Sequence, residues 1–274
     1  MSRAGAGTVV GFIGAGQMGE PMVHRLLGAG HKVVVYARRA EVRQRLADAG
    51  VSVADSVADV AAQADVLVLC LFSDAQLREV ASGETGFMAN AKPGAVVVSH
   101  VTGNVATLEA LVADHPDGPS VVDAPVSGSA DDISAGKLTV LLGGAEGSVE
   151  RAESVLVAYA DPIVRTGGLG SALNLKLVNN VLFAANAQLV AAAVELGQKL
   201  GIGDAELLSA VALSSGRSHA LNSVKLLGGL DRFGAVAAPF LRKDVAACAT
   251  AADAAGIELG WLRSVVDSGP LDLS

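Results

Sequence analysis

The stretch TVVGFIGAGQMGEP, residues 8–21, decides the fold of this chain. A short apolar run over Val9–Ile13 leads into GAGQMG, in which Gly14, Gly16 and Gly19 make a G-x-G-x-x-G turn. Apolar residues at helical spacing follow the turn. A strand, a glycine turn and a helix in this order predict a dinucleotide-binding unit.

The turn itself supplies the first candidate cofactor contacts, which are Gly14, Ala15, Gly16, Gln17, Met18 and Gly19. Gly14 permits the tight turn, Gly16 lets the backbone approach a pyrophosphate, and Gly19 lets the helix pack closely on the strand. The free N–H groups and the positive dipole end of the helix would face the phosphates.

Composition places the chain among soluble proteins. Its 274 residues can hold one large domain or two ordinary ones. The hydrophobic content is 51% and the mean hydropathy is +0.47, but no run reaches the ~20 uninterrupted apolar residues that span a bilayer. The segment Met1–Gly7 is too short and polar for a signal peptide. We therefore expect a soluble, cytoplasmic protein.

Net charge and cysteine spacing argue against two kinds of ligand, nucleic acid and metal ions. The net charge is −8 and the basic residues form no cluster beyond Arg38-Arg39, which argues against nucleic acid as the main partner. Cys70 and Cys248 lie far apart and lack metal-ligand spacing, so no metal site is expected. Both cysteines are most simply small buried residues in a reducing compartment.

The first half of the chain alternates strands with helices. Each predicted strand is a short run rich in Val, Leu and Ile, as is typical of strands buried on both faces. The predicted strands are Val9–Ile13, His31–Ala37, Val66–Leu71, Ala95–Ser99, Ser120–Asp123 and Leu138–Leu142, and the helices include Glu41–Ala49, Ser56–Ala62 and Ala106–Asp114. The alternation predicts an α/β fold with a Rossmann-type, doubly wound, mostly parallel sheet.

The pattern changes after the glycine-rich segment Thr166–Gly170. Apolar residues then recur at three and four over Ser171–Leu200, which predicts one interdomain helix of roughly 45 Å. Further helices are expected at Asp204–Leu213, Leu221–Leu227, Pro239–Ala255 and Gly260–Asp267. We expect a nucleotide-binding domain over residues 1–166 and an all-α domain over 167–274, with the site where they meet.

The end of the second predicted strand indicates which nicotinamide cofactor is bound. An NAD enzyme usually carries an acidic residue there, about 20 residues past the glycines, for the ribose 2′-hydroxyl. Here the strand ends in Arg38 and Arg39, with no acid before Glu41. Guanidinium groups bind phosphate through a planar fork, so this pair favours NADP(H) over NAD(H). The alternative is two solvated arginines at a strand end.

A second candidate site is DAPVSGS, residues 123–129, directly after a predicted strand. A turn that ends a parallel strand lies at the edge of the sheet where ligands bind. Ser127, Gly128 and Ser129 could hold a substrate carboxylate there. The alternative is an ordinary Pro-Ser-Gly loop.

A third candidate lies in the first turns of the long predicted helix. Lys176 and Asn180 are four residues apart and share one helix face. A lysine in an apolar segment can be desolvated, which eases loss of its proton, and it can then act as a general acid. Asn180 could fix a substrate oxygen. On spacing alone, a lysine with an exposed ammonium and a capping asparagine explain the pattern equally well.

Taken together, these motifs resemble the β-hydroxyacid dehydrogenase family, which includes 3-hydroxyisobutyrate dehydrogenases and is related to 6-phosphogluconate dehydrogenase. The matching stretches cover nearly the whole chain in order. They are GFIGAGQMGEPM (11–22), DAPVSGS (123–129), GKLTVLLGG (136–144), KLVNN (176–180), SSGRS (214–218) and KDVAACATAA (243–252).

The resemblance implies a role for each candidate residue. Lys176 would be the acid/base, and Ser127 and Gly128 would bind the substrate carboxylate with help from Asn180. The cofactor would contact Leu71, Phe72 and Lys243, and Thr102 would contact it on the nicotinamide side. The resemblance also implies a small β-hydroxyacid or semialdehyde substrate, and a homodimer or homotetramer joined through the helical domain.

Departures from the family pattern gather around the substrate. Only Thr102 remains of the family's D-x-S-T-x-x-P segment, which reads SHVTGNV here. His100 in this segment could add a polar contact to the pocket, but an exposed loop histidine is the expectation. Ser129 replaces a glycine, and His219 stands where many members carry an aromatic residue. The substrate itself therefore stays open.

Two other functions compete with this one. Imine reductases share the architecture, but they usually lack the lysine of the pair formed by Lys176 and Asn180. A non-catalytic nucleotide-binding protein would keep the fold and lose the reaction, whereas this chain retains both Lys176 and the loop at Ser127 and Gly128.

Overall fold

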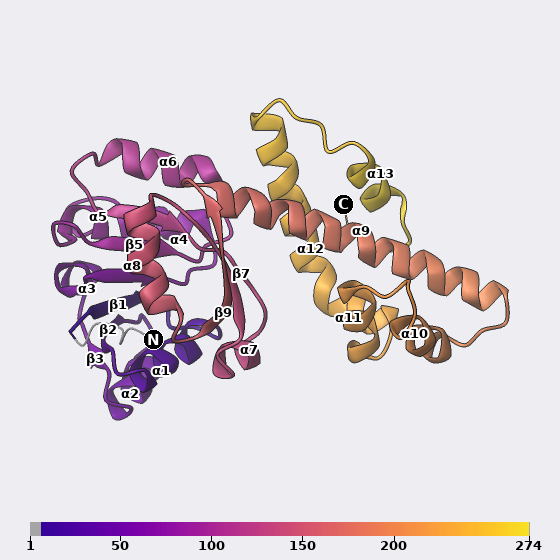
Figure 1. Cartoon of the computed structure of the whole chain (residues 1–274), viewed down its shortest axis with the longest axis horizontal. Coiled ribbons are helices and arrows are strands. Elements are labelled where there is room, and N and C mark those ends of the chain that lie inside the picture. The colour runs from indigo at the N-terminus through magenta and orange to yellow at the C-terminus, as the bar shows by residue number, and fades with distance from the viewer. Residues whose placement is uncertain (1–6, 274) are drawn as a thin grey trace. The chain divides into compact units, whose positions relative to one another are not determined.

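The computed structural model describes residues 7–273 (Figure 1). The chain divides into two compact units, Met1–Lys176 and Leu177–Ser274. The boundary falls within one long helix, so that Lys176 ends the first unit and Asn180 lies in the second.

The first unit is built on one sheet, which has nine strands within the described residues. The strands are β1 (Val9–Ile13), β2 (Lys32–Tyr36), β3 (Ser52–Val53), β4 (Val66–Leu69), β5 (Val96–Ser99), β6 (Ser120–Asp123), β7 (Val126–Ser127), β8 (Leu138–Gly143) and β9 (Ala160–Gly167). Their order is β3-β2-β1-β4-β5-β6-β8-β7, and β9 pairs with β8. Strands β1 to β6 run parallel to one another, while β8 runs antiparallel to β6 and β7. The predicted doubly wound, mostly parallel sheet is confirmed.

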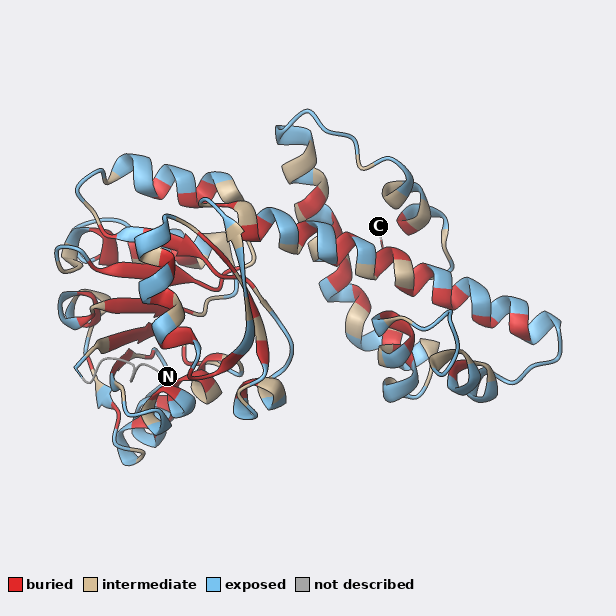
Figure 2. Ribbon diagram, in the orientation of Figure 1, coloured by how far each residue is buried: buried red, intermediate tan, exposed pale blue. Residues whose placement is uncertain are grey.

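Helices cover both faces of this sheet. They are α1 (Gly19–Gly28), α2 (Ala40–Asp48), α3 (Val57–Gln63), α4 (Asp74–Ala81), α5 (Phe87–Asn90), α6 (Val105–Asp114), α7 (Ala130–Ser134) and α8 (Glu146–Leu156). Apolar residues of α1, α2, α7 and α8 form the core on one face, and those of α3 to α6 form the core on the other. The strands between them are therefore buried, as Figure 2 shows.

The strand order reverses direction beside β1. Strand β2 pairs with one edge of β1 and β4 pairs with the other. Crossovers leave β1 and β4 toward opposite faces, which opens a crevice at the carboxyl ends of these strands, where open α/β sheets bind ligands. The glycine turn follows β1 at this point.

The second unit is helical. Helix α9 (Ser171–Lys199) runs into it, and α10 (Asp204–Ala212), α11 (His219–Leu227), α12 (Leu230–Ala254) and α13 (Trp261–Ser268) follow. By length and composition α9 is the one described helix that could cross a membrane, but 56% of its apolar window is buried inside the protein. Its small buried residues, among them Ala184, Ala187 and Val194, pack in the core of this unit. Such burial is typical of a core helix.

Several elements differ from the sequence-based expectations. Strands β3, β7 and β9 were not predicted, and helix α12 begins at Leu230 rather than at Pro239, which lies inside it. β9 carries Asp161, Pro162 and Arg165 and is largely exposed, so it lacks the apolar run by which the other strands were predicted. Pairing with β8 makes it a strand.

Candidate functional site

A cleft of about 620 Å³ lies at the carboxyl ends of the first four strands. Its walls come from the segments that follow β1, β2, β3 and β4, together with α4. Seven predicted cofactor contacts line it, namely Gly14, Ala15, Gly16, Arg38, Arg39, Leu71 and Phe72. These residues are far apart in the sequence, and the parallel sheet brings them together because it aligns its strand ends at one edge.

The glycines of the turn have three different physical roles. Gly14 has a φ of 101°, a conformation that favours glycine, and a Cβ there would overlap the carbonyl of Cys70. A Cβ at Gly19 would overlap the carbonyl oxygen of Gly14, so glycine lets α1 pack against the turn. A Cβ at Gly16 would meet nothing within 4 Å. The space over Gly16 is thus open to a ligand.

The turn also presents unused hydrogen-bond donors. The N–H of Gly16 donates to the carbonyl of Gly14 at 2.8 Å, but within residues 7–273 the N–H groups of Ala15, Gln17 and Met18 have no acceptor. These donors stand at the N-terminus of α1, whose dipole favours an anion. The geometry fits a dinucleotide pyrophosphate.

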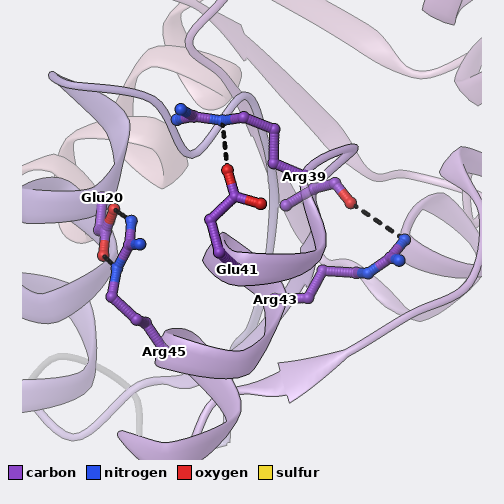
Figure 3. Close-up of polar contacts among 6 residues, drawn as sticks. Glu20, Arg39, Glu41, Arg43 and Arg45 are labelled. Carbon is purple, nitrogen blue, oxygen red and sulfur yellow. Dashed lines mark hydrogen bonds and ion pairs between the residues drawn. The ribbon is translucent and has the colours of Figure 1, made fainter.

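The one acidic side chain in the first turn of α1 is neutralised. Arg45 of α2 donates to both carboxylate oxygens of Glu20, at 2.9 and 2.7 Å, as Figure 3 shows. The hydrogen bonds from Arg45 lower the pKa of the Glu20 carboxyl. The bidentate pair leaves the positive character of the helix N-terminus available to a ligand.

The predicted arginine pair lies on the wall formed after β2. Arg39 is paired with Glu41 at 3.8 Å, and Arg43 donates to the carbonyl of Ala37 at 3.5 Å (Figure 3). Arg38 is exposed, and no other described residue pairs with it. In this wall the guanidinium group of Arg38 is therefore not bound by another described residue and is available to a ligand.

Three of the predicted cofactor residues, Gln17, Met18 and Gly19, belong to the turn but are not part of the cleft wall. Thr102 lies between β5 and α6, also outside that wall, and Lys243 lies on α12 in the second unit. Their contacts with a cofactor stay predictions.

The predicted substrate loop is shaped by an internal carboxylate. Ser129 is the N-cap of α7 in a capping box: its hydroxyl accepts the backbone N–H of Asp132 at 3.3 Å, and its own N–H donates to the Asp132 carboxylate at 2.7 Å. The hydroxyl also donates to that carboxylate at 2.7 Å. Gly128 has a φ of 139°, which favours glycine at this position. Ser127 and Gly128 are exposed. The Ser129 hydroxyl is thus already engaged, and Ser127 and Gly128 face solvent.

The predicted catalytic pair lies in α9, as expected from its spacing. Lys176 is half-buried and Asn180 is buried. The side-chain amide of Asn180 donates to the carboxylate of Asp244 at 3.0 Å. Sequence reasoning missed Asp244, although its position beside Lys243 in the KDVAACATAA stretch was a signal.

The structure corrects one expectation about the segment after β5. His100 is buried rather than exposed: its Nδ1 lies 2.5 Å from the carbonyl oxygen of Ala124 and its Nε2 lies 2.8 Å from the Tyr159 hydroxyl. Burial lowers the pKa of His100 to about 4. The ring is therefore neutral and takes part in the core rather than in substrate binding. His219 contacts an aromatic ring, that of Phe183, at 5.7 Å between centroids.

These features define the first unit as a dinucleotide-binding domain: a doubly wound sheet, a glycine turn with unused donors and a cleft at the switch point. Residues 9–168 match the family described as the NAD binding domain of 6-phosphogluconate dehydrogenase, and residues 170–267 match the NAD-binding family of NADP-dependent 3-hydroxyisobutyrate dehydrogenase. The chain belongs to this β-hydroxyacid dehydrogenase family, and the predicted resemblance is confirmed.

Several individual proteins that are similar to this chain are named 3-hydroxyisobutyrate dehydrogenase. The mitochondrial 3-hydroxyisobutyrate dehydrogenase of Rattus norvegicus is 33% identical over 211 residues, which are 77% of this chain and 63% of that protein. The chain thus matches less than two thirds of that relative's length. Among solved structures, 3-hydroxyisobutyrate dehydrogenase of Mycobacterium tuberculosis with L-serine has a TM-score of 0.84 at 27% identity, covering 95% of this chain and 91% of that one. The Salmonella typhimurium enzyme has a TM-score of 0.80 at 25% identity, with coverage of 95% and 92%.

Proposed function

We propose that this protein is an NADP(H)-dependent oxidoreductase that transfers a hydride between the nicotinamide and a small β-hydroxyacid or semialdehyde. One observation carries the proposal: Ala15 and Gly16 of the glycine turn, the first with a backbone N–H that has no acceptor within residues 7–273, line the same cleft as Arg38. NADP has two anionic parts, a pyrophosphate and a 2′-phosphate. The glycine turn would bind the pyrophosphate, and Arg38 would bind the 2′-phosphate.

The residues of the first unit would hold the cofactor at both anionic parts. Backbone N–H groups of the glycine turn bind the pyrophosphate, and the open space over Gly16 admits it. The nicotinamide supplies or accepts the hydride when the cofactor is bound. Arg38 binds the 2′-phosphate through its fork, and Arg39 shares its charge between that phosphate and Glu41.

Lys176 supplies the proton that accompanies the hydride. In reduction its ammonium protonates the carbonyl oxygen, and in oxidation its amine removes the hydroxyl proton. Asn180, one turn farther along α9, orients the substrate oxygen. Asp244 supports this role because it accepts the Asn180 amide and thereby holds that side chain in one orientation.

The segment Ser127–Ser129 binds the substrate carboxylate. Support comes from its position after β6 at the ligand-binding edge of the sheet and from the related structure determined with L-serine, which is itself a β-hydroxyacid. Ser127 and Gly128 make the direct contacts, while the Ser129 hydroxyl acts through its capping box with Asp132.

The test is the loss of NADPH absorbance with a panel of small carbonyl compounds. The panel contains semialdehydes that carry a carboxylate, glyoxylate, neutral aldehydes and cyclic imines. Turnover of the acids supports the proposal, and turnover restricted to imines makes the chain an imine reductase. A protein that binds NADPH in equilibrium titration but turns over none of the panel would be a non-catalytic nucleotide-binding protein.

We also propose that two copies pair along α9. Leu182, Leu189 and Leu196 are seven residues apart and each is about half exposed, so they form one apolar stripe along the helix. Such spacing suits the α9 of a second copy, because leucines at heptad spacing pack into the holes of a facing helix. Leu189→Glu is expected to convert a dimer to a monomer in sedimentation equilibrium, whereas Leu213→Glu, outside the stripe, leaves the dimer intact. A wild-type monomer contradicts the proposal.

A further inference from the structure

The segment after β5 is tied to the start of α4 by one side chain. The carboxylate of Asp74 accepts the backbone N–H of Asn104 at 2.9 Å. A Cβ at Gly103 would overlap that carboxylate, so the glycine permits the close approach of Asp74. Both ends of this contact lie next to predicted cofactor residues, since Phe72 precedes Asp74 by two residues and Thr102 precedes Asn104 by two.

Asp74 is available for this contact because another residue caps its helix. The hydroxyl of Ser73 is the N-cap of α4 and accepts the N–H of Gln76 at 3.3 Å. The side chain of Asn104 in turn caps α6 by accepting the N–H of Ala106 at 2.9 Å. The carboxylate therefore joins the starts of two helices that leave neighbouring strands, β4 and β5.

The same turn of α4 also holds the wall of the cofactor cleft. Gln76 accepts the backbone N–H of Phe72 at 2.9 Å, and both residues line the cleft. The first turn of α4 thus holds both Phe72, through Gln76, and the Thr102–Asn104 segment, through Asp74. The distance between the cleft wall and that segment depends on Asp74.

We infer that Asp74 is a positioning residue for the nicotinamide end of the cofactor. The inference rests on the proposed function and on the family resemblance, which implies that Thr102 contacts the cofactor on its nicotinamide side. Asp74 holds residues 102–104 where that end binds, and it leaves the pyrophosphate and 2′-phosphate contacts untouched, since those lie on the glycine turn and Arg38. Loss of Asp74 therefore weakens binding of one end of the cofactor selectively.

The experiment measures the affinity of two ligands by calorimetric titration: intact NADP, and 2′-phospho-ADP-ribose, which is NADP without the nicotinamide. Asp74→Ala is expected to bind NADP about tenfold more weakly, the size of one hydrogen bond to a charged group, and to bind the fragment like the wild type. Asp74→Asn, whose amide oxygen accepts the same N–H, is expected to restore NADP affinity to within about threefold.

Two further variants separate positioning from simple packing. Arg78→Ala removes the hydrogen bond from Arg78 to Thr107, 2.9 Å long, which joins the same two helices away from the loop. It is expected to lower the melting temperature and to leave both affinities unchanged. Gly103→Ala, which keeps Asp74 but displaces its carboxylate, is expected to reproduce the selective loss, and it serves as the test should Asp74→Ala fail to fold.

Equal weakening of both ligands by Asp74→Ala, or no weakening of either, overturns the inference. So does the same selective loss in Arg78→Ala, because packing between the helices would then explain it. A wild-type protein that binds neither ligand instead refutes the proposed function, and the inference with it.

Discussion

The buried carboxylate of Asp123 accepts the backbone N–H of Leu173 at 2.8 Å, so the end of β6 holds the first turn of α9. The other carboxylate oxygen accepts the N–H of Gly170, also at 2.8 Å. The first N–H groups of a helix have no acceptor within the helix, and its N-terminus favours negative charge. Asp123 satisfies both needs, and Lys176 follows one turn later on the helix that it anchors.

Replacing Asp123 by asparagine is expected to destabilise the protein by about 2–4 kcal/mol. Asparagine keeps one acceptor oxygen, and its amide group would face a backbone N–H that also donates. Chemical denaturation of Asp123→Asn and of Asp114→Asn, an exposed aspartate at the end of α6, measures the difference. Equal stability of the two variants would show that the carboxylate does not hold α9.

Arg38→Ala is expected to raise the KM for NADP by about tenfold or more and to change the KM for NAD by less than about twofold, since NAD lacks the phosphate that the guanidinium binds. Arg39→Ala is the matched comparison, and it should have a smaller effect because Arg39 already pairs with Glu41. Steady-state kinetics with both cofactors measures this. An equal rise for NAD and NADP would remove Arg38 from phosphate recognition.

Lys176→Ala is expected to lower kcat by about 100-fold or more, as loss of a general acid does, while NADPH binding stays near the wild-type value. Lys199→Ala, at the far end of the same helix, is the control for removing a lysine from α9. Turnover and NADPH titration of both variants provide the measurement. An unchanged kcat in Lys176→Ala would exclude this lysine from the mechanism.

The buried His100 predicts a pH dependence of stability. Its pKa is about 4 in the folded protein because of burial, whereas an unfolded histidine titrates near its ordinary value of 6.5. Between these values the unfolded chain binds the extra proton, so stability is complete above about pH 6.5 and falls by about 2 kcal/mol on lowering the pH to about 5.

Denaturation at several pH values in the wild type and in His100→Gln tests this dependence. Burial also lowers the pKa of His31, which adds to the slope in both proteins, so the difference between them isolates His100. Parallel pH profiles in the two proteins would show that His100 does not carry the effect.

The sequence by itself determined the elements whose signals are local. The run Val9–Ile13 is apolar enough to be a strand buried on both faces, and Gly14 after it permits the positive φ that the turn requires. The periodicity of residues 171–200 likewise predicted α9 to within one residue of its observed end. Each of these depends on neighbours a few residues away, and the sequence records those neighbours directly.

Only the tertiary structure decided the contacts that depend on distant partners. His100 was expected to be exposed and is buried, and its two ring nitrogens make hydrogen bonds with the carbonyl of Ala124 and the hydroxyl of Tyr159, 24 and 59 residues away. The carboxylate of Asp74 likewise accepts the backbone N–H of Asn104, a residue 30 positions away that lies at the start of the next helix crossover. A single sequence states which polar groups exist but not which distant group satisfies each one, since that pairing is set when the sheet aligns its strand ends.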